Sequence, residues 1–384
     1  MDATLTIDDA VNRPWDILVI GAGPAGAMAA CEAAAAGARV LLVDRARFPR
    51  TKVCGCCLNG AALGVLERAG LGALPEQLRA PKLREFQLAY HGRIASVPLR
   101  EGISLSRERF DTALIEVCVD RGAQFLDAAQ ALVQDVESEA RRVELRVDNR
   151  VFVVTARIVI VASGLGARSF DRQQDDPRLT ARTSRIGAGA VLSDSSAAIP
   201  LGRICMACHR DGYVGLVRLE DGRLNIAAAL DSAAVKRDQI AHVVGRIIDE
   251  SGLPVPEDVA VADWHGTAKL TQRRDHVFGD RYFVVGDAAG YIEPFTGEGM
   301  AWALATGKTV ASFALESLAD GTHATGPAWV AKRSQLTARR MRLCRTIGHA
   351  LRHPTFVGLA VWLLARSPGL AKPIVHSLNA SFRY

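Results

Sequence analysis

The sequence predicts an α/β fold organised around a Rossmann-like nucleotide-binding domain. The first observation is an apolar strand over 15–20 that runs into a glycine-rich turn, an alanine-rich helix ending at Gly37 and a second apolar strand over 39–43. The second is another strand, glycine-rich turn and alanine-rich helix, which begins at Tyr282. Third, the 384 residues include 49% hydrophobic and 23% charged side chains, a balance typical of folded enzymes with a large core.

The first glycine-rich turn predicts a dinucleotide-binding site. Residues 21–26 are Gly21, Ala22, Gly23, Pro24, Ala25 and Gly26, a G-x-G-x-x-G pattern between strand and helix. In order, its glycines permit a tight turn, approach of the backbone to a pyrophosphate, and close packing of helix on strand. Amides and the dipole at the helix N-terminus favour the phosphate charge. Asp44 is expected to accept hydrogen bonds from a ribose, and Arg45 beside it belongs to the same predicted site.

The second glycine-rich turn identifies the dinucleotide as FAD. An NAD site needs no such second element, whereas a flavin needs a carboxylate for its ribityl hydroxyls and positive potential near its reduced ring. Gly286 and Asp287 end the second strand, and the Asp287 carboxylate suits the ribityl chain. The helix that follows Gly297, starting near Gly299 and Met300, offers free amides and a dipole for the ring. We therefore predict FAD as the cofactor.

Together these stretches resemble the p-hydroxybenzoate hydroxylase superfamily of FAD-dependent oxidoreductases, most closely its geranylgeranyl reductase-like and monooxygenase branch. Residues 44–71 resemble the segment in which a K-x-C-G run, here ending at Cys54 and Gly55, crosses near the flavin. Residues 106–125 resemble the segment whose arginine, here Arg107, contacts the cofactor. Gly164 lies where the family usually has A-D-G followed by small residues.

The chain departs from the family pattern at two places. Ser163 replaces the aspartate of A-D-G, so the role of that aspartate is not carried over to this chain. Cys56 and Cys57 follow the K-x-C-G run, where the branch commonly has an acid and a glycine. The W-x-W signature of the tryptophan halogenases is absent from the sequence, which argues against halogenation.

The resemblance implies a discontinuous FAD-binding domain, a mixed β-sheet substrate domain inserted in pieces, and C-terminal helices that pack against the substrate cavity. The expected FAD-binding domain comprises 12–80, 101–185 and 270–335. The expected substrate domain comprises 81–100 and 186–269, and the helical segment comprises 336–384. In the second substrate-domain piece, composition predicts strands over 203–209, 213–219 and 223–230, a hairpin turn at Asp221-Gly222 and a helix over 235–251.

Residues 204–210 contain C-x-x-C-H, the pattern that attaches a c-type haem. Cys205 and Cys208 fall on a predicted strand, where residues three apart point to opposite faces, so two thioether bonds to one haem are geometrically poor. We therefore expect no haem and, because no matched second pair is evident, no metal site. One of the two thiols is expected to pack in the core and the other to face the cavity.

Composition also predicts a location. The first fourteen residues carry three aspartates and no apolar stretch, so we expect a cytoplasmic protein without a secretory signal, whose eight cysteines are reduced thiols. From Gly321 onward there are ten Lys and Arg and no Asp or Glu, which favours peripheral contact with anionic membrane or attraction to acidic substrates. The alternative is a solvated basic helical face. The ten-residue apolar run over 356–365 is short of the about 20 residues that cross a membrane.

Three functions are open at this point, all without a nucleic-acid partner. The first is hydroxylation of a hydrophobic or aromatic small molecule by reduced FAD and oxygen, in a dry pocket. The second, implied by the resemblance, is reduction of C=C bonds in a lipidic substrate, with Cys54 or Cys56 as proton donor. The alternative for these thiols is a structural role as small buried hydrophobes. The third is a non-catalytic redox or partner role for the flavin. We rank hydroxylation first.

The reductant is expected to be NAD(P)H or a protein donor, since no second G-x-G-x-x-G occurs.

Overall fold

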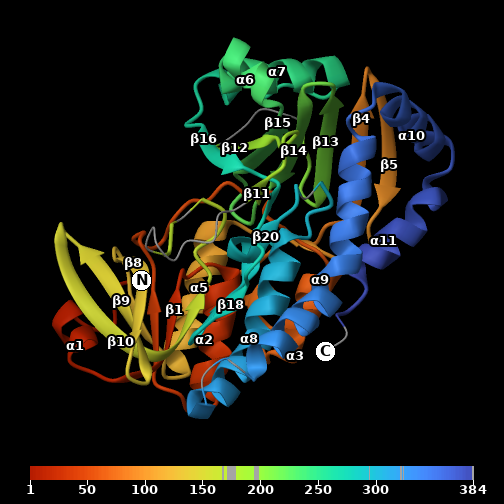
Figure 1. Ribbon diagram of the computed structural model, residues 1–384. Helices are drawn as coiled ribbons and strands as arrows, with labels where there is room; N and C mark the ends of the chain where they lie inside the picture. Colours follow the sequence, from red (N-terminus) through yellow and green to blue (C-terminus); the bar gives the residue numbers. More distant parts are fainter. Residues whose placement is uncertain are drawn as a thin grey trace.

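The structure is a computed structural model that describes residues 1–166, 168–170, 179–193, 199–293, 295–320, 322 and 324–382. Two large β-sheets form its framework, one at the lower left and one at the top of Figure 1. The long helix α9 (Thr325–Ala350) runs from the first sheet toward the second. The site described below lies between these sheets, because its walls come from both.

The first sheet has the strand order β18-β19-β10-β1-β2-β7. Strands β7, β2, β1, β10 and β19 run parallel to their neighbours, whereas the edge strand β18 is antiparallel. The first half of β10 instead pairs with β9, which pairs with β8. The members are β1 (Trp15–Ile20), β2 (Val40–Val43), β7 (Gln124–Leu126), β8 (Gln130–Glu137), β9 (Ala140–Val147), β10 (Arg150–Val161), β18 (Phe278–Gly279) and β19 (Tyr282–Val284).

Helix α2 (Pro24–Ala35) packs on this sheet between α5 (Arg107–Asp120) and α8 (Gly299–Asp320). It is almost wholly buried because alanine side chains let neighbouring helices approach closely. The approach is closest where Gly307 of α8 meets the carbonyl group of Ala25, since a Cβ atom at Gly307 would lie 2.1 Å from that oxygen. The remaining helices near this sheet are α1 (Ile7–Val11), α3 (Gly60–Arg68) and α4 (Leu74–Gln77).

The second sheet has the order β16-β12-β15-β14-β13-β4-β5. Helix α7 (Ile240–Ser251) covers one face through its apolar residues, and the other face turns toward the cavity. Helix α6 (Ser232–Arg237) and the 3-10 turn η1 (Glu257–Ala260) flank α7. The strands are β4 (Glu85–Tyr90), β5 (Arg93–Pro98), β12 (Ile186–Leu192), β13 (Arg203–His209), β14 (Gly212–Arg218), β15 (Leu224–Leu230) and β16 (His265–Lys269).

Two small sheets connect the large ones. The first joins β11 (Leu179–Thr180), β17 (Gln272–Arg273) and β20 (Gly290–Tyr291), and the 3-10 turn η2 (Gly286–Ala289) leads into β20. The second pairs β3 (Cys57–Leu58) with β6 (Ile103–Ser104). The strands of every sheet fall inside the ranges expected for their domain, although the domain limits themselves stay a prediction.

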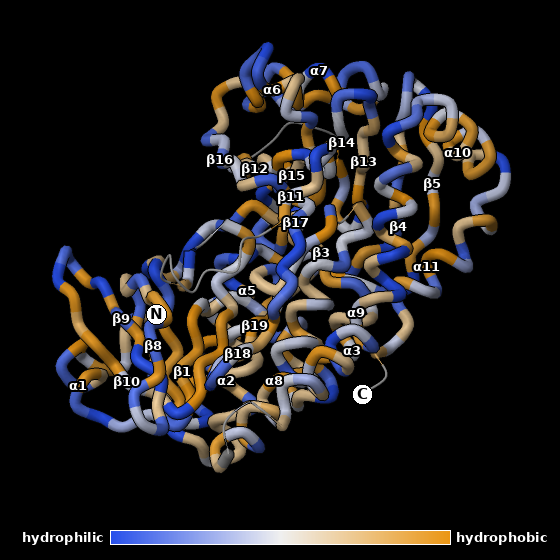
Figure 2. Tube along the Cα trace, in the orientation of Figure 1, coloured by the Kyte–Doolittle hydropathy of each residue, from blue (hydrophilic) through white to orange (hydrophobic). Residues whose placement is uncertain are grey.

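The C-terminal residues form a cap over the second sheet. We define the cap as residues 354–379, made of α10 (Pro354–Arg366), η3 (Pro368–Ala371) and α11 (Lys372–Asn379). Helix α10 and η3 pack against β5, and Figure 2 shows apolar residues of α10 at the outer edge of the molecule. Within the described part of the chain, no helix is both long enough and apolar enough to span a bilayer.

One expectation about helices was wrong. The helix expected over 235–251 is two helices, because Asp238 is extended and its carboxylate accepts hydrogen bonds from the amide of Gln239 and from the ring of His242. The C-terminal segment is helical, as expected: α9 continues to Ala350, and the short helices α10 and α11 follow from Pro354 onward. The predicted strands at 203–209, 213–219 and 223–230 are confirmed to within one residue as β13, β14 and β15.

The C-x-x-C-H pattern lies on β13, and its two thiols point to opposite faces as expected. Cys205 packs among residues of α7, whereas Cys208 packs with Tyr213 and with Val357 of the cap. Both are buried free thiols. Their separation across the sheet explains the pattern as ordinary alternation in a buried strand.

Candidate functional site

The N-terminus of α2 faces three basic side chains. Gly23 is its N-cap, and no side chain among the described residues caps it. A Cβ atom at Gly23 would meet only guanidinium groups, Nη2 of Arg107 at 3.6 Å and Nη2 of Arg50 at 3.7 Å. Lys52 lines the same space. Free helix amides and three cations together favour a bound phosphate group.

Acidic side chains hold two of these cations in place. The fully buried Asp111 accepts hydrogen bonds from Nε and Nη2 of Arg107 at 2.9 and 2.7 Å, and lies 3.3 Å from Nη2 of Arg50. Burial lowers the pKa of Arg107, but the charges and hydrogen bonds of Asp111 and Cys54 together outweigh it, so that the pKa rises overall. Burial, followed by the charges of Arg107 and Arg50, lowers the pKa of Lys52. Among these three basic side chains, the positive charge therefore lies mainly on the guanidinium groups of Arg107 and Arg50.

Two glycines of the turn are required by the fold itself. Gly21 has φ +102°, and a Cβ there would lie 2.5 Å from the carbonyl oxygen of Ala162 on the strand beside it. A Cβ at Gly26 would lie 1.8 Å from the carbonyl oxygen of Gly21. These contacts seat the turn and the first turn of α2 against the sheet, which leaves Gly23 as the residue that faces the ligand space.

Asp44 follows β2 and is almost buried. Its carboxylate accepts hydrogen bonds from the amides of Ala22 at 2.7 Å and Ala46 at 2.9 Å, so it fixes the glycine-rich turn. Arg45 is exposed, and it lies outside the set of described residues that line the cavity. The structure thus gives Asp44 a position beside the turn but brings no cavity contact to Arg45.

One continuous cavity of about 600 Å³ reaches from the N-terminus of α2 to the cap. Its walls are mainly apolar at the cap end, where β4, β13 and β14 face α10 and α11. Eleven predicted cofactor residues line it: Gly23, Pro24, Ala25, Cys54, Gly55, Arg107, Gly164, Asp287, Gly297, Gly299 and Met300. The others, Gly21, Ala22, Gly26, Asp44, Arg45 and Gly286, are not lining residues of the described cavity.

The second glycine-rich turn brings a carboxylate and a helix N-terminus to one end of this cavity. Asp287 lies in η2, next to Gly286, which has φ +57° and packs against Ala25 of α2. Helix α8 begins at Gly299, as predicted. Tyr291 lines the cavity beside them, and burial followed by the Asp287 charge raises the pKa of its phenol.

Three cysteines lie on the loop that crosses the same end. Cys54 is half-buried and its sulfur accepts a hydrogen bond from the amide of Cys56 at 3.4 Å. Hydrogen bonding from the Cys56 thiol, with a smaller effect of the Arg107 charge, lowers the pKa of Cys54 to about 6. The same pairing raises the pKa of Cys56, and burial raises that of Cys57. Of the two predicted proton donors, Cys56 therefore keeps its proton at neutral pH, whereas Cys54 is a thiolate.

Ser163, the residue that stands in the place of the family's aspartate, has a local partner. Its hydroxyl accepts a hydrogen bond from Ser169 at 2.5 Å, and Ser163 is not among the described residues that line the cavity. The adjacent Gly164 does line it and lies close to Lys52, since a Cβ there would be 3.0 Å from Nζ. Lys52 thus lies beside Gly164, the residue that follows the family's acid position.

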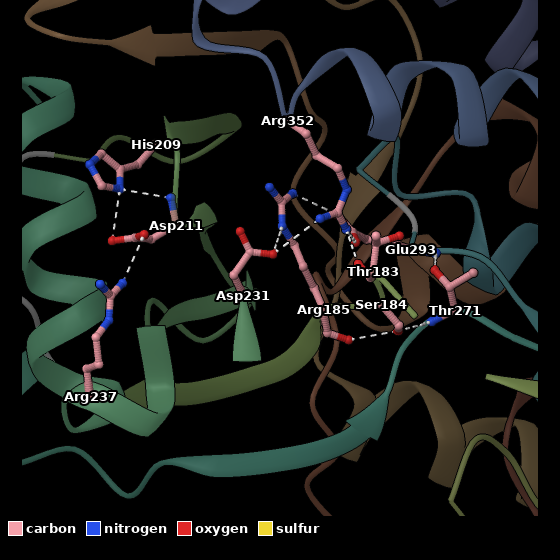
Figure 3. Close-up of polar contacts among 10 residues, drawn as sticks. All are labelled: Thr183, Ser184, Arg185, His209, Asp211, Asp231, Arg237, Thr271, Glu293 and Arg352. Atoms are coloured by element: carbon pink, nitrogen blue, oxygen red, sulfur yellow. Dashed lines mark hydrogen bonds and ion pairs between the residues drawn. The ribbon is translucent and has the colours of Figure 1, made fainter. Parts of the chain in front are cut away.

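A four-residue charge cluster joins the flavin-side loop to the cap (Figure 3). Arg185 is fully buried and binds Glu293 at 2.9 Å and Asp231 at 3.3 Å. Arg352, between α9 and the cap, binds the same two carboxylates at 3.5 and 3.3 Å and donates to the carbonyl oxygen of Thr183. Glu293 follows Tyr291, so the cluster ties the start of the cap to the loop that leads to α8.

The other end of the cap is held by hydrogen bonds. Arg340 of α9 pairs with the buried Glu298 and donates to the carbonyl oxygens of Leu378 and Ala380. Asn59 donates to the carbonyl oxygen of Leu378 at 3.2 Å. The cap is therefore fixed at both ends, while its middle is held by apolar packing on β5.

The donor set fits an adenine dinucleotide with a flavin ring. Uncapped amides and three cations match a pyrophosphate, Asp287 matches a ribityl chain, and the N-terminus of α8 matches the electron-rich edge of a reduced ring. The fold and site define a flavin-dependent oxidoreductase. The chain belongs to the FAD binding domain family, whose pattern matches residues 15–313, and FAD is its cofactor.

Related sequences place it in the geranylgeranyl reductase-like branch. The menaquinone reductase of Mycobacterium tuberculosis is 31% identical over 340 residues, which cover 80% of this chain and 77% of that protein. Digeranylgeranylglycerophospholipid reductase 2 of Methanopyrus kandleri is 28% identical over 319 residues, which cover 80% and 78% of the two chains. The resemblance drawn from the motifs is confirmed.

Solved structures share the fold. A flavin-dependent brominase superposes with a TM-score of 0.78 at 15% identity, covering 96% of this chain and 94% of its own. The myxobacterial chondrochloren halogenase gives a TM-score of 0.77 at 19% identity, covering 95% and 93%. At these identities the similarity confirms the architecture alone.

Several site residues were not found from sequence. Arg50, Lys52 and Asp111 belong to the charged group near the N-terminus of α2, and of these only Lys52 lines the cavity and belonged to a motif that the sequence singled out. Arg185 and Glu293 come from stretches 108 residues apart. The sequence does not show that these two residues pair. The one local sign is the charged Arg185 directly before the apolar strand β12.

Proposed function

We propose that this protein reduces C=C bonds in a long isoprenoid chain. The observation that supports the proposal is the cavity, which continues from the cofactor residues into an apolar channel under the cap. Phe86, Leu88, Ile204 and Met206 from the second sheet line that channel. Two relatives support the same substrate class, because their names specify a menaquinone and a digeranylgeranyl lipid, both of which carry isoprenoid chains.

The chain's own residues have three tasks in this reaction. FAD, when bound, supplies the hydride. The apolar wall binds the isoprenoid chain and excludes water from the double bond. A proton must reach the second carbon, and we propose Cys56 as its source because it keeps its proton while Cys54 does not.

The test is turnover of an isoprenoid lipid by the FAD-loaded enzyme under anaerobic conditions with a chemical reductant. We expect products heavier by pairs of hydrogen atoms, and much slower turnover by Cys56→Ala than by Cys57→Ala. Products that carry one added oxygen atom, formed only in air, would instead support hydroxylation, the function ranked first from sequence. Anaerobic turnover by Cys56→Ala at the rate of Cys57→Ala would remove Cys56 as the donor.

We also propose that the cap contacts an anionic membrane, from which the substrate enters. The cap exposes several large apolar side chains: Phe356, Leu359, Trp362, Leu363, Leu370 and Ile374. Three of these, Phe356, Leu370 and Ile374, also line the cavity, so the apolar surface continues into it. Arg366, whose guanidinium lies 4.0 Å from the centroid of the Trp362 ring, and Lys372 add positive charge that attracts anionic lipid.

Point substitutions test this contact better than truncation, because residues beyond Arg340 form part of the cavity wall. We expect Leu359→Glu with Leu370→Glu to abolish salt-sensitive sedimentation with vesicles of mixed phosphatidylglycerol and phosphatidylcholine. The matched control is Leu201→Glu with Val261→Glu, which replaces apolar residues outside the cap that are at least as exposed. Equal vesicle binding by both double variants would contradict the proposal and leave the basic segment as a solvated face.

A further inference from the structure

We propose that Cys54 and Cys56 form a dithiol/disulfide pair that exchanges two electrons with the bound flavin. The inference requires FAD binding but not the proposed substrate class. Only one member of the pair departs from the family pattern, because Cys56 stands where the branch commonly has an acid, whereas Cys54 belongs to the K-x-C-G run. The pair would give the enzyme a second store of electrons beside the cofactor.

The position of the pair supports electron exchange with the flavin. Both cysteines line the cavity together with Gly23, Asp287 and Gly297. Arg107, the first residue of α5, lies close enough for its positive charge to act on the Cys54 sulfur, and its guanidinium also faces the N-terminus of α2. The sulfur atoms therefore lie within the chamber that holds the cofactor residues, and the core does not separate them from it.

The two thiols have the unequal protonation that thiol oxidation uses. The amide and thiol of Cys56 stabilise the Cys54 thiolate, and Arg107 adds positive charge, which keeps the pKa of Cys54 low. Cys56 is almost wholly buried, its sulfur lies 3.5 Å from Oδ1 of Asn225, and its hydrogen bond to Cys54, together with burial, raises its own pKa. A thiolate beside a neutral thiol is the state from which a disulfide forms when an oxidant accepts two electrons.

The backbone also allows the sulfur atoms to join. Residues two apart span at most about 7 Å, which is near the upper Cα separation for a disulfide, and a bent backbone brings them closer. Here Cys56 has the left-handed φ of 53°, so the chain bends at this residue. Cys57 points elsewhere, because its thiol donates to the carbonyl oxygen of Gly55 at 3.1 Å. The geometry selects the pair of Cys54 with Cys56 over pairs with Cys57.

The reaction balances with FAD as the only other reactant. Oxidation of one thiolate and one thiol forms the S–S bond and releases two electrons and one proton. Oxidised FAD accepts both electrons and that proton to give its singly protonated reduced form, and the reverse reaction reopens the disulfide. Electrons from an external reductant can thus be shared between the flavin and the sulfur pair.

Anaerobic reductive titration of the air-oxidised, FAD-loaded enzyme with dithionite measures this store. We expect four electrons per FAD for the wild type and two for Cys54→Ser and for Cys56→Ser. Cys57→Ser is the matched control and should keep four. A wild type that accepts only two electrons overturns the proposal, as does a Cys56→Ser variant that still accepts four.

Mapping of blocked thiols gives a readout that does not depend on the flavin. Trypsin should release residues 53–68, which contain all three cysteines of the loop. In oxidised enzyme, alkylation under denaturing conditions should label one of these cysteines, and after reduction it should label all three. Labelling of all three in oxidised enzyme overturns the proposal. A disulfide found instead between Cys31 and Cys118, which interact in the core, also overturns it. Neither result depends on turnover of an isoprenoid lipid, so the proposed function can fail or succeed separately.

Discussion

The contact between α8 and α2 makes a sharp prediction about Gly307. A methyl group there would lie 2.1 Å from the carbonyl oxygen of Ala25 and 2.9 Å from its carbonyl carbon. Ordinary van der Waals contact begins near 3.4 Å, so Gly307→Ala must push α8 away from α2 by roughly 1 Å. Because Ala25 lies in the first turn of α2, the displacement acts directly on the phosphate end of the cavity.

Two opposing contributions set the change in the free energy of unfolding that we expect for Gly307→Ala. Overpacking costs about 1–3 kcal/mol, and a clash with backbone belongs at the upper end of that range. Replacing glycine by alanine within a helix returns about 1 kcal/mol. We therefore expect Gly307→Ala to lower the free energy of unfolding by roughly 2 kcal/mol. Gly245→Ala in α7 is the matched control, since its methyl would lie 3.7 Å from Cγ1 of Val259, and it should raise that free energy by up to about 1 kcal/mol.

Urea denaturation of the FAD-free proteins measures both variants without the contribution of bound cofactor. Flavin fluorescence titration then compares their affinity for FAD, which should fall for Gly307→Ala and stay unchanged for Gly245→Ala. Equal unfolding midpoints for Gly307→Ala and Gly245→Ala would refute the described packing of α8 on α2. Unchanged FAD affinity in a destabilised Gly307→Ala would refute the link between this packing and the phosphate end.

Three further predictions concern the site. Gly23→Val and Asp287→Ala should each lower FAD occupancy, measured by flavin absorbance, while circular dichroism stays that of the wild type; full occupancy in both would contradict the assigned site. Iodoacetamide should label Cys54 with a midpoint near pH 6, because a lowered pKa makes the reactive thiolate present above that pH. Cys56→Ala should move the midpoint upward, and a wild-type midpoint near pH 8.5, usual for free cysteine, would count against the thiolate. Arg352→Met should release the cap and make it more sensitive to limited proteolysis, and an unchanged digestion rate would show that apolar packing alone holds it.

The parts of the fold that depend on local pattern could be predicted from sequence. Strand β1 was placed at 15–20, and three strands of the second sheet, β13, β14 and β15, to within one residue, because buried alternation and turn residues mark strands directly. The break at Asp238 was missed because an apolar period continues across it. The end of α9 at Ala350 was not predicted for a different reason, since its basic residues carry no strong helix period that marks where the helix stops.

Some residues of the candidate site could be predicted from sequence and others could not. Gly23 and Asp287 could be predicted because a glycine-rich turn fixes where its neighbours lie. The pairing of Arg107 with Asp111 within one helix was also accessible in principle, at a spacing of four residues. The cluster of Arg185, Glu293 and Arg352 was not, because these side chains meet only after three distant stretches have packed together.

The way the cap is attached separates the two ends of the cavity. The family pattern ends at residue 313, whereas the cap that closes the far end of the cavity spans 354–379. Apart from its apolar packing, the cap is held mainly by the polar contacts of Arg352 at its start and Arg340 at its end. Substitutions in the cap can therefore change the far end of the cavity while the cofactor residues stay the same. This separation predicts that cap variants change the affinity for substrate while the affinity for FAD stays that of the wild type.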